Sequence, residues 1–145
     1  MFSACLLFVL FNIVEMVSAT RNCPVSVGSY RKRDTVLDPL AKLIEEKVKG
    51  ASYACALEPR AYLRFVQLTE QQWQKVYGKV KNTMELEYET EKPEKYLRQP
   101  EELAKEAVQK WSSDLAGAKG GRFACIIDQR KQPTKTAYKV ACLFE

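Results

Sequence analysis

The chain has no histidine among its 145 residues. Imidazole is the base in Ser-His-Asp and Cys-His nucleophilic sites, a frequent zinc ligand and the usual general base at neutral pH. Its absence excludes those classes of active site. A catalytic site in this chain would need an acid and a base made without imidazole, so we expect a protein that is not an enzyme and that has no metal ligands.

Motifs for cofactors and nucleic acids are also missing. The glycines at 117, 120 and 121 lead into a predicted strand rather than a helix, so they do not form a phosphate-binding loop. The cysteines are too widely spaced for a CxxC redox or zinc site. Basic residues cluster only at 31–33 and 130–131, without the interleaved aromatic residues that single-stranded nucleic acid requires. We therefore expect no cofactor and no nucleic-acid partner.

The first nineteen residues have a different composition from the rest. Leu6 to Val14 is almost wholly apolar but too short to span a membrane, and Val17-Ser18-Ala19 offers the small residues that signal peptidase prefers. This pattern predicts a secretory signal over residues 1–19, cleaved after Ala19. The alternative is an uncleaved anchor, because Glu15 is present and no basic residue precedes the apolar run. The remainder, residues 20–145, is long enough for a single domain and contains no second apolar run, so we expect no stable membrane insertion.

Of the five cysteines, Cys5 lies in the predicted signal, and the other four suggest two disulfide bonds. Residues 123–127 and 138–144 each alternate at the period of a strand, about a polar turn at Pro133 and Thr134. Folding there brings Cys125 opposite Cys142, at a separation that permits a cross-strand disulfide. Cys23 would then pair with Cys55. The alternative is two unpaired cysteines in the core.

Apolar spacing predicts two helices on either side of the middle of the chain. The first begins at Asp38 as N-cap, has Pro39 at its first position and stops at Gly50. The longest runs from about Pro100 to Ala116, with acidic residues at its positive end. Their apolar stripes consist of Leu40, Leu43, Ile44 and Val48 in the first, and of Leu103, Ala104, Ala107, Val108, Trp111 and Leu115 in the second.

Between these helices the sequence is more ambiguous. Pro59 is able to start a helix that carries Ala61, Tyr62, Phe65 and Val66 inward, and a strand over residues 62–68 is the competing interpretation. Thr69 and Gln72 have the spacing of a capping box. The helix behind them would bury Trp73, Val76, Tyr77 and Val80.

A strand and a loop follow. Met84, Leu86 and Tyr88 alternate with glutamates at 85, 87 and 89, as in a half-buried strand with an acidic outer face. A solvated edge explains these glutamates better than a calcium site or a pair of catalytic carboxylates. Residues 90–99 are polar and contain a proline, which predicts a loop.

One short motif resembles a known binding element. Gln74, Val76 and Gly78 match the Q-x-V-x-G pattern of the first hairpin loop with which cystatins block papain-like proteases. In this chain the pattern falls inside a predicted helix, and the loop over residues 130–135 lacks the tryptophan of the second cystatin hairpin. A cysteine-protease inhibitor acting through Gln74–Gly78 is the alternative function.

Four segments, read in chain order, resemble the CAP superfamily, the SCP/TAPS or venom-allergen-like secreted proteins, and especially those abundant in parasitic worms. Residues 37–50 are similar to the first helix of that family, and residues 53–61 to its Y-x-C-x-L-E-x-x-A step into the second helix. Residues 107–115 resemble its A-V-x-x-W helix, and residues 124–144 its closing cysteine hairpin. The resemblance implies an α+β fold, a CAP-like α-β-α sandwich in which helices pack on a small antiparallel sheet that ends in a disulfide hairpin.

The chain also departs from that family. CAP proteins hold two histidines and two acidic residues in a central cavity that takes a divalent metal, and this chain has neither histidine. The resemblance therefore implies the scaffold without the metal site. It also implies a secreted, non-catalytic protein that binds a host or extracellular protein, or a small lipid.

Overall fold

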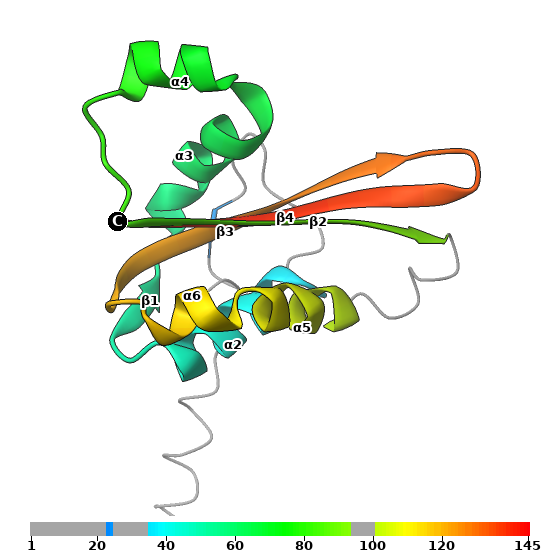
Figure 1. Ribbon diagram of the computed structural model, residues 1–145, viewed down its shortest axis with the longest axis horizontal. Helices are drawn as coiled ribbons and strands as arrows, with labels where there is room; N and C mark the ends of the chain where they lie inside the picture. Colours follow the sequence, from blue (N-terminus) through cyan, green and yellow to red (C-terminus); the bar gives the residue numbers. More distant parts are fainter. Residues whose placement is uncertain (1–22, 25–34, 94–100) are drawn as a thin grey trace, which may run out of the picture.

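The computed structural model describes residues 23–24, 35–93 and 101–145. The predicted signal over residues 1–19 and the basic cluster Arg31–Arg33 lie outside the described residues. The elements form three layers (Figure 1), with a sheet between two sets of helices. No helix among the described residues is long and apolar enough to cross a membrane.

The middle layer is a sheet of four strands in the order β1-β3-β4-β2. The C-terminal hairpin consists of β3 (Gly121–Lys131) and β4 (Lys135–Phe144), and its register places Cys125 opposite Cys142. Disulfide bonds join Cys125 to Cys142 and Cys23 to Cys55. The C-terminal disulfide hairpin is therefore confirmed.

The sheet is mixed, whereas an antiparallel sheet was expected. Strand β1 (Ala51–Tyr53) runs parallel to the start of β3. A strand of three residues is too short for alternating apolar and polar residues to reveal it in the sequence. Its partner lies about seventy residues away in the chain. Gly50 in the turn before β1 has a φ of +81°, which favours glycine because it has no Cβ.

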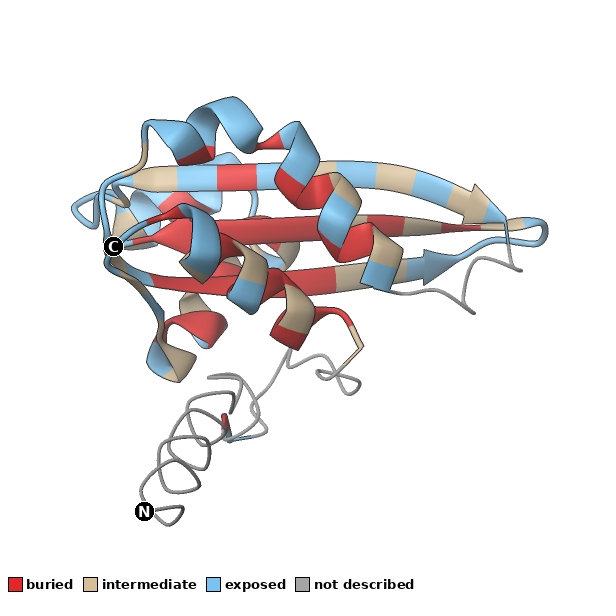
Figure 2. Ribbon diagram, turned by 90° about the horizontal axis from the view of Figure 1, so that it is seen from below, coloured by how far each residue is buried: buried red, intermediate tan, exposed pale blue. Residues whose placement is uncertain are grey.

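The lower layer contains α2 (Leu37–Lys47), α5 (Glu101–Lys110) and α6 (Ser112–Ala116). Seen from this side, buried residues form a band along β3 and β4 and on the helices in front of them (Figure 2). All six residues of the predicted row from Leu103 to Leu115 are buried. This main core also contains Leu40, Ile44, Phe123, Val140 and Phe144.

Two helix boundaries in this layer differ from the prediction. Helix α2 begins at Leu37, and the amide of Leu40 donates to the carbonyl of Val36 at 2.9 Å, so Asp38 lies in the first turn and is not the N-cap. The burial of Val36 and Leu37, each 1% exposed, draws the helix start upstream. The predicted helix over 100–116 is divided at Trp111 into α5 and α6.

The upper layer contains η1 (Cys55–Leu57), α3 (Glu58–Tyr62), η2 (Leu63–Gln67) and α4 (Glu70–Tyr77). Residues 62–67 are helical, which decides against the competing strand. Ala61 and Phe65 pack on a second, smaller core of Ala124, Ile126, Ala141 and Leu143. The sheet is thus covered by apolar contacts on both faces near its β1 end.

Helix α4 begins with the predicted capping box, because Thr69 and Gln72 each accept a hydrogen bond from the other's backbone amide. Its predicted burial is wrong in part. Trp73 is 3% exposed, but Val76 and Val80 are 65% and 38% exposed. The helix lies at the outside of the upper layer, where the stacking of Tyr77 and Arg64 on Trp73 encloses that one side chain.

Strand β2 (Met84–Pro93) has the predicted alternation but extends beyond it. Residues 90–93, expected to be loop, pair with Tyr138 to Lys135 of β4. A polar segment becomes a strand here because a long neighbouring strand offers its backbone groups as partners. Residues 94–99 of the predicted loop lie outside the described residues.

Candidate binding face

One half of the upper sheet face lies beyond the helices that cover the other half. In Figure 1, α3 and α4 lie over the end of the sheet near the C-terminus, and the β3–β4 hairpin extends well past them. No described helix packs on the upper face of this extension. We call it the open sheet face and define it by six residues: Glu89, Glu91, Asp128, Arg130, Ala137 and Lys139.

Strand register places these six side chains in two rows across the sheet. Glu89, Lys139 and Asp128 are direct neighbours on β2, β4 and β3, and Glu91, Ala137 and Arg130 form the next row. Closer to β1, the same face carries Ala141 and Ile126, which the helices cover. The upper face therefore changes from apolar to charged where the helices end.

A hollow of about 450 Å³ lies on this face. It is lined by the six residues of the open sheet face together with Thr90 and Tyr138. Ala137 is the only one of the six with a methyl side chain, and it lies between Glu91 and Arg130. The small side chain leaves room for the hollow, and the charged side chains surround it.

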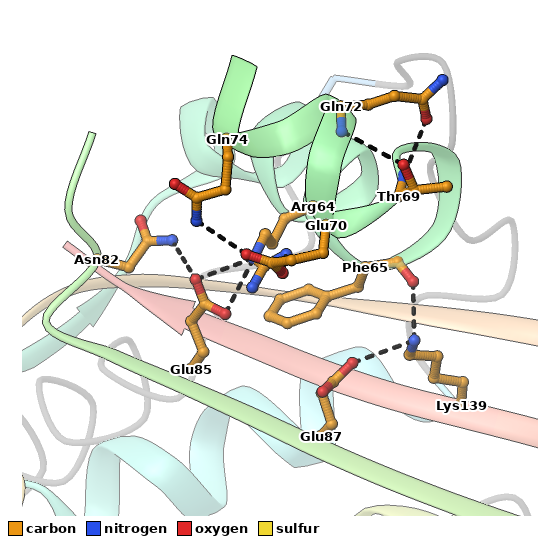
Figure 3. A network of polar contacts seen from close by, with 10 residues as sticks. All are labelled: Arg64, Phe65, Thr69, Glu70, Gln72, Gln74, Asn82, Glu85, Glu87 and Lys139. Atoms are coloured by element: carbon orange, nitrogen blue, oxygen red, sulfur yellow. Dashed lines mark hydrogen bonds and ion pairs between the residues drawn. The ribbon is translucent and has the colours of Figure 1, made fainter. Parts of the chain in front are cut away.

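Lys139 on the open sheet face forms a hydrogen bond to the upper layer. Its Nζ donates to the backbone carbonyl of Phe65 in η2 at 2.8 Å and lies 3.1 Å from a carboxylate oxygen of Glu87 (Figure 3). A carboxylate oxygen of Glu89 lies 3.7 Å away. The side chain is 24% exposed, so this ammonium group is fixed from both the helix and the sheet.

A second ionic network holds the upper helices to β2. Arg64 donates to Glu85 at 3.0 Å and to Glu70 at 2.6 Å (Figure 3). Burial alone would lower the pKa of Arg64, but the hydrogen bonds to Glu85 and Glu70 outweigh it and raise that pKa. Hydrogen bonds from Gln74 and Arg64 lower the pKa of Glu70. Both groups are therefore charged at neutral pH, which maintains the contact between helix and strand.

The remaining charges of the open sheet face also have partners. Nε of Arg130 lies 3.2 Å from a carboxylate oxygen of Asp128 on the same strand, and Lys135 pairs with Glu91 across the sheet. The side chains are thereby held in an alternating pattern of charge. Among the described residues there is no cluster of three or more acidic or cysteine side chains with the arrangement of a metal site.

A comparison with protein-family models matches residues 23–144 to the family described as Ancylostoma-associated secreted protein related. The chain belongs to this family. This family is related to the CAP superfamily, so the resemblance of the four sequence segments to CAP proteins is confirmed. Searches of curated proteins and of solved structures found no match.

In this member of the family, the cystatin-like motif lies on α4 and at its end rather than at a hairpin tip. Gln74 donates to Glu70 at 2.8 Å, Val76 points largely into solvent, and Gly78 follows the last helical residue. A Cβ at Gly78 would lie 2.3 Å from the carbonyl oxygen of Gln74. Packing at the helix end therefore accounts for the glycine, and a hydrogen bond within the helix accounts for the glutamine.

Sequence reasoning named the acidic residues of β2 but missed the cations that face them. Glu85, Glu87 and Glu89 are exposed, as expected, and pair with Arg64 and Lys139. The predicted pairing of Cys125 with Cys142 already fixes the register of β3 and β4. Continued one residue at a time along both strands, that register would have placed Asp128 beside Lys139 and Arg130 beside Ala137.

Proposed function

We propose that this protein is a secreted, non-catalytic binding protein that uses the open sheet face to hold an extracellular partner. The observation that carries the proposal is the hollow of about 450 Å³, surrounded by ordered charges on a sheet face that no described helix covers. Such a surface offers shape and charge to a partner. It offers no imidazole, and the sequence contains none elsewhere.

The chemistry of the lining favours a polar partner. A lipid tail seated in the hollow would remove water from Glu89, Lys139 and Arg130 without giving them new partners, which is unfavourable for charged groups. A peptide or protein surface supplies its own charges and backbone groups. Of the two partner classes that the CAP resemblance implies, the protein is therefore the one we propose.

Two observations support an extracellular setting. The chain belongs to a family described as secreted protein related, and its structure contains two disulfide bonds, which persist in oxidising compartments. Expression of the full chain in eukaryotic cells tests this part of the proposal. We expect a mature protein in the medium that begins at Thr20, as read by N-terminal sequencing. Retention in the cell with an intact N-terminus would contradict it.

Filling the hollow tests the binding face. Ala137→Trp places an indole between Glu91 and Arg130, and Ser113→Trp adds the same side chain to the exposed surface of α6 in the lower layer. A displayed library of extracellular protein domains is first selected for binding to the wild-type protein. The selected domains should bind Ala137→Trp at least about tenfold more weakly than they bind the wild type. They should bind Ser113→Trp as they bind the wild type. Equal binding to all three proteins would refute the open sheet face as the site.

The inhibitor alternative has a separate test. A cystatin-type wedge needs an extended hairpin tip, whereas residues 70–77 are helical. We therefore expect no inhibition when a papain-like protease is titrated with micromolar protein. Tight inhibition that is lost on Val76→Asp, an exposed position where the change spares the core, would establish the alternative.

A further inference from the structure

Strand β2 is the last strand of the sheet on the side away from β1, and its outer edge has no partner strand among the described residues. The opposite side of the sheet is formed by β1 and, beyond β1, by β3. Strand β1 pairs with the start of β3, and beyond it the hydroxyl oxygen of Tyr53 lies 3.3 Å from the carbonyl oxygen of Cys125. Beyond these contacts the outer edge of β3 also has no partner strand among the described residues, so each side of the sheet is open over part of its length in the described part of the chain.

The register shows which residues of β2 turn their backbone groups outward. The amide of Glu145 donates to the carbonyl of Arg122 at 2.9 Å, one step beyond the pair Phe123 and Phe144. Because antiparallel pairs alternate, the odd-numbered residues of β4 bond to β3 and the even-numbered ones bond to β2. Thr90, opposite Tyr138, therefore faces inward. Glu89 and Glu91 direct their N–H and C=O groups to the outer edge.

One contact and one proline mark the ends of this open segment. The indole Nε1 of Trp111 donates to the carbonyl of Glu87 at 3.0 Å, which agrees with an outward carbonyl at that position and closes the edge there. Pro93, at the end of β2, has no N–H to donate. The open segment thus extends from Glu89 to Glu91, beside the hollow that the same two residues line.

Charge decides which strand fits. Glu89 and Glu91 are 72% and 52% exposed on the upper face, and a strand added to the edge would place every second side chain directly beside them. A second copy of β2 in antiparallel pairing would set glutamate against glutamate, which is unfavourable. A segment with lysine or arginine at alternate positions would set cations against them instead.

We propose that the outer edge of β2 at Glu89–Glu91 binds an extended segment of a partner protein that carries basic residues at alternate positions, as an added antiparallel strand. The segment gains backbone hydrogen bonds from the edge and ion pairs from the two glutamates. This inference rests on the proposed function, because it names the class of partner that the open sheet face receives. The adjacent hollow then accommodates the part of the partner next to that strand.

The probe is the peptide Thr-Lys-Val-Lys-Val-Lys-Thr, blocked at both ends, with the full secreted protein and binding measured by calorimetry. The variant Glu89→Lys with Glu91→Lys should weaken binding at least about tenfold, because it opposes like charges. The control, Glu46→Lys with Asp114→Lys, makes the same change of charge at exposed positions on the lower helices and should bind as the wild type does.

N-methylation separates strand addition from simple attraction of charge. In antiparallel pairing the lysines lie opposite the glutamates and direct their N–H groups to β2, so N-methyl lysines should abolish binding. N-methyl valines should leave it unchanged. Equal binding of both methylated peptides, no binding of the parent peptide, or dimers of the wild-type protein that the peptide dissociates would each overturn the proposal.

The Ala137→Trp variant distinguishes failure of this inference from failure of the proposed function. That variant tests the hollow with the selected domains, whereas the basic peptide with the wild-type protein tests the edge of β2, so the two experiments report separately. If Ala137→Trp weakens binding of the selected extracellular domains but the basic peptide does not bind the wild type, the edge proposal fails and the binding face stands. If neither binds, both proposals fail.

Discussion

Replacing Lys139 with methionine removes the ammonium group that joins η2 to the sheet and leaves most of the aliphatic chain in place. The largest loss is the hydrogen bond from Nζ to the carbonyl of Phe65, at 2.8 Å from a side chain that is 24% exposed. A hydrogen bond to a charged group contributes about 1.5–3 kcal/mol. The two carboxylate partners, Glu87 and Glu89, are 53% and 72% exposed, and such pairs add together less than about 1 kcal/mol.

We therefore expect Lys139→Met to lower the free energy of unfolding by about 2 kcal/mol, with a fall in Tm of about 6–8 °C for a domain of this size. Urea unfolding followed by tryptophan fluorescence measures the first quantity. Hydrogen exchange should also rise at residues 65–68, because η2 loses its attachment to β4. The assay thus reports both the global loss and its place in the fold.

Lys135→Met is the matched control, because Lys135 lies on the same strand and is 43% exposed, with Glu91 as its partner. It should cost less than about 0.5 kcal/mol. Salt gives a second check. Exposed ion pairs are screened at 0.5 M NaCl, but the hydrogen bond to the Phe65 carbonyl is not, so most of the difference between the two variants should remain. Equal losses in both variants, or a Lys139 effect that vanishes in salt, would refute the reasoning.

Three further predictions concern stability. Replacing Cys125 and Cys142 with serine opens a loop of 17 residues and should cost about 3 kcal/mol, seen as a lower urea midpoint; an unchanged midpoint would show that the bridge adds nothing. Thr69→Ala removes the capping box of α4 and should cost about 1 kcal/mol by thermal unfolding, whereas Thr69→Ser should retain it, and equal values for both would contradict the cap. Burial, aided by the hydrogen bond to Glu106, raises the pKa of Tyr88, so its contribution is complete below the ordinary tyrosine pKa and is lost as pH rises through the higher folded value. The wild type should therefore lose more stability than Tyr88→Phe in titrations above about pH 10, and parallel curves would refute this.

Short sequence patterns predicted the helices and strands that are determined by interactions between residues close together in the chain. The capping box of Thr69 and Gln72 marked the start of α4, and the alternation from Met84 to Tyr88 marked β2. The cysteines of the terminal hairpin fixed the register of β3 and β4. Each of these patterns arises from hydrogen bonds or side-chain directions within a few residues, or from one covalent link.

Elements that depend on distant partners were not predictable in the same way. Strand β1 needs the start of β3, and residues 90–93 extend β2 only because β4 lies beside them. Val76 follows the helical spacing of a buried residue, but no element in the described part of the chain covers that side of α4, and it stays exposed. Spacing records which side chains share a face and does not record whether anything packs on it.

The sequence by itself determined the absence of imidazole chemistry, the disulfide hairpin and the membership of a CAP-related family. Only the tertiary structure decided where the candidate binding face lies, because the position of a helix over a sheet depends on packing between segments far apart in the chain. Lys139 and Arg130 are ordinary surface cations in the sequence. They surround a hollow because η2 contacts Lys139 through Phe65 and no described helix covers the rest of the charged half of the sheet.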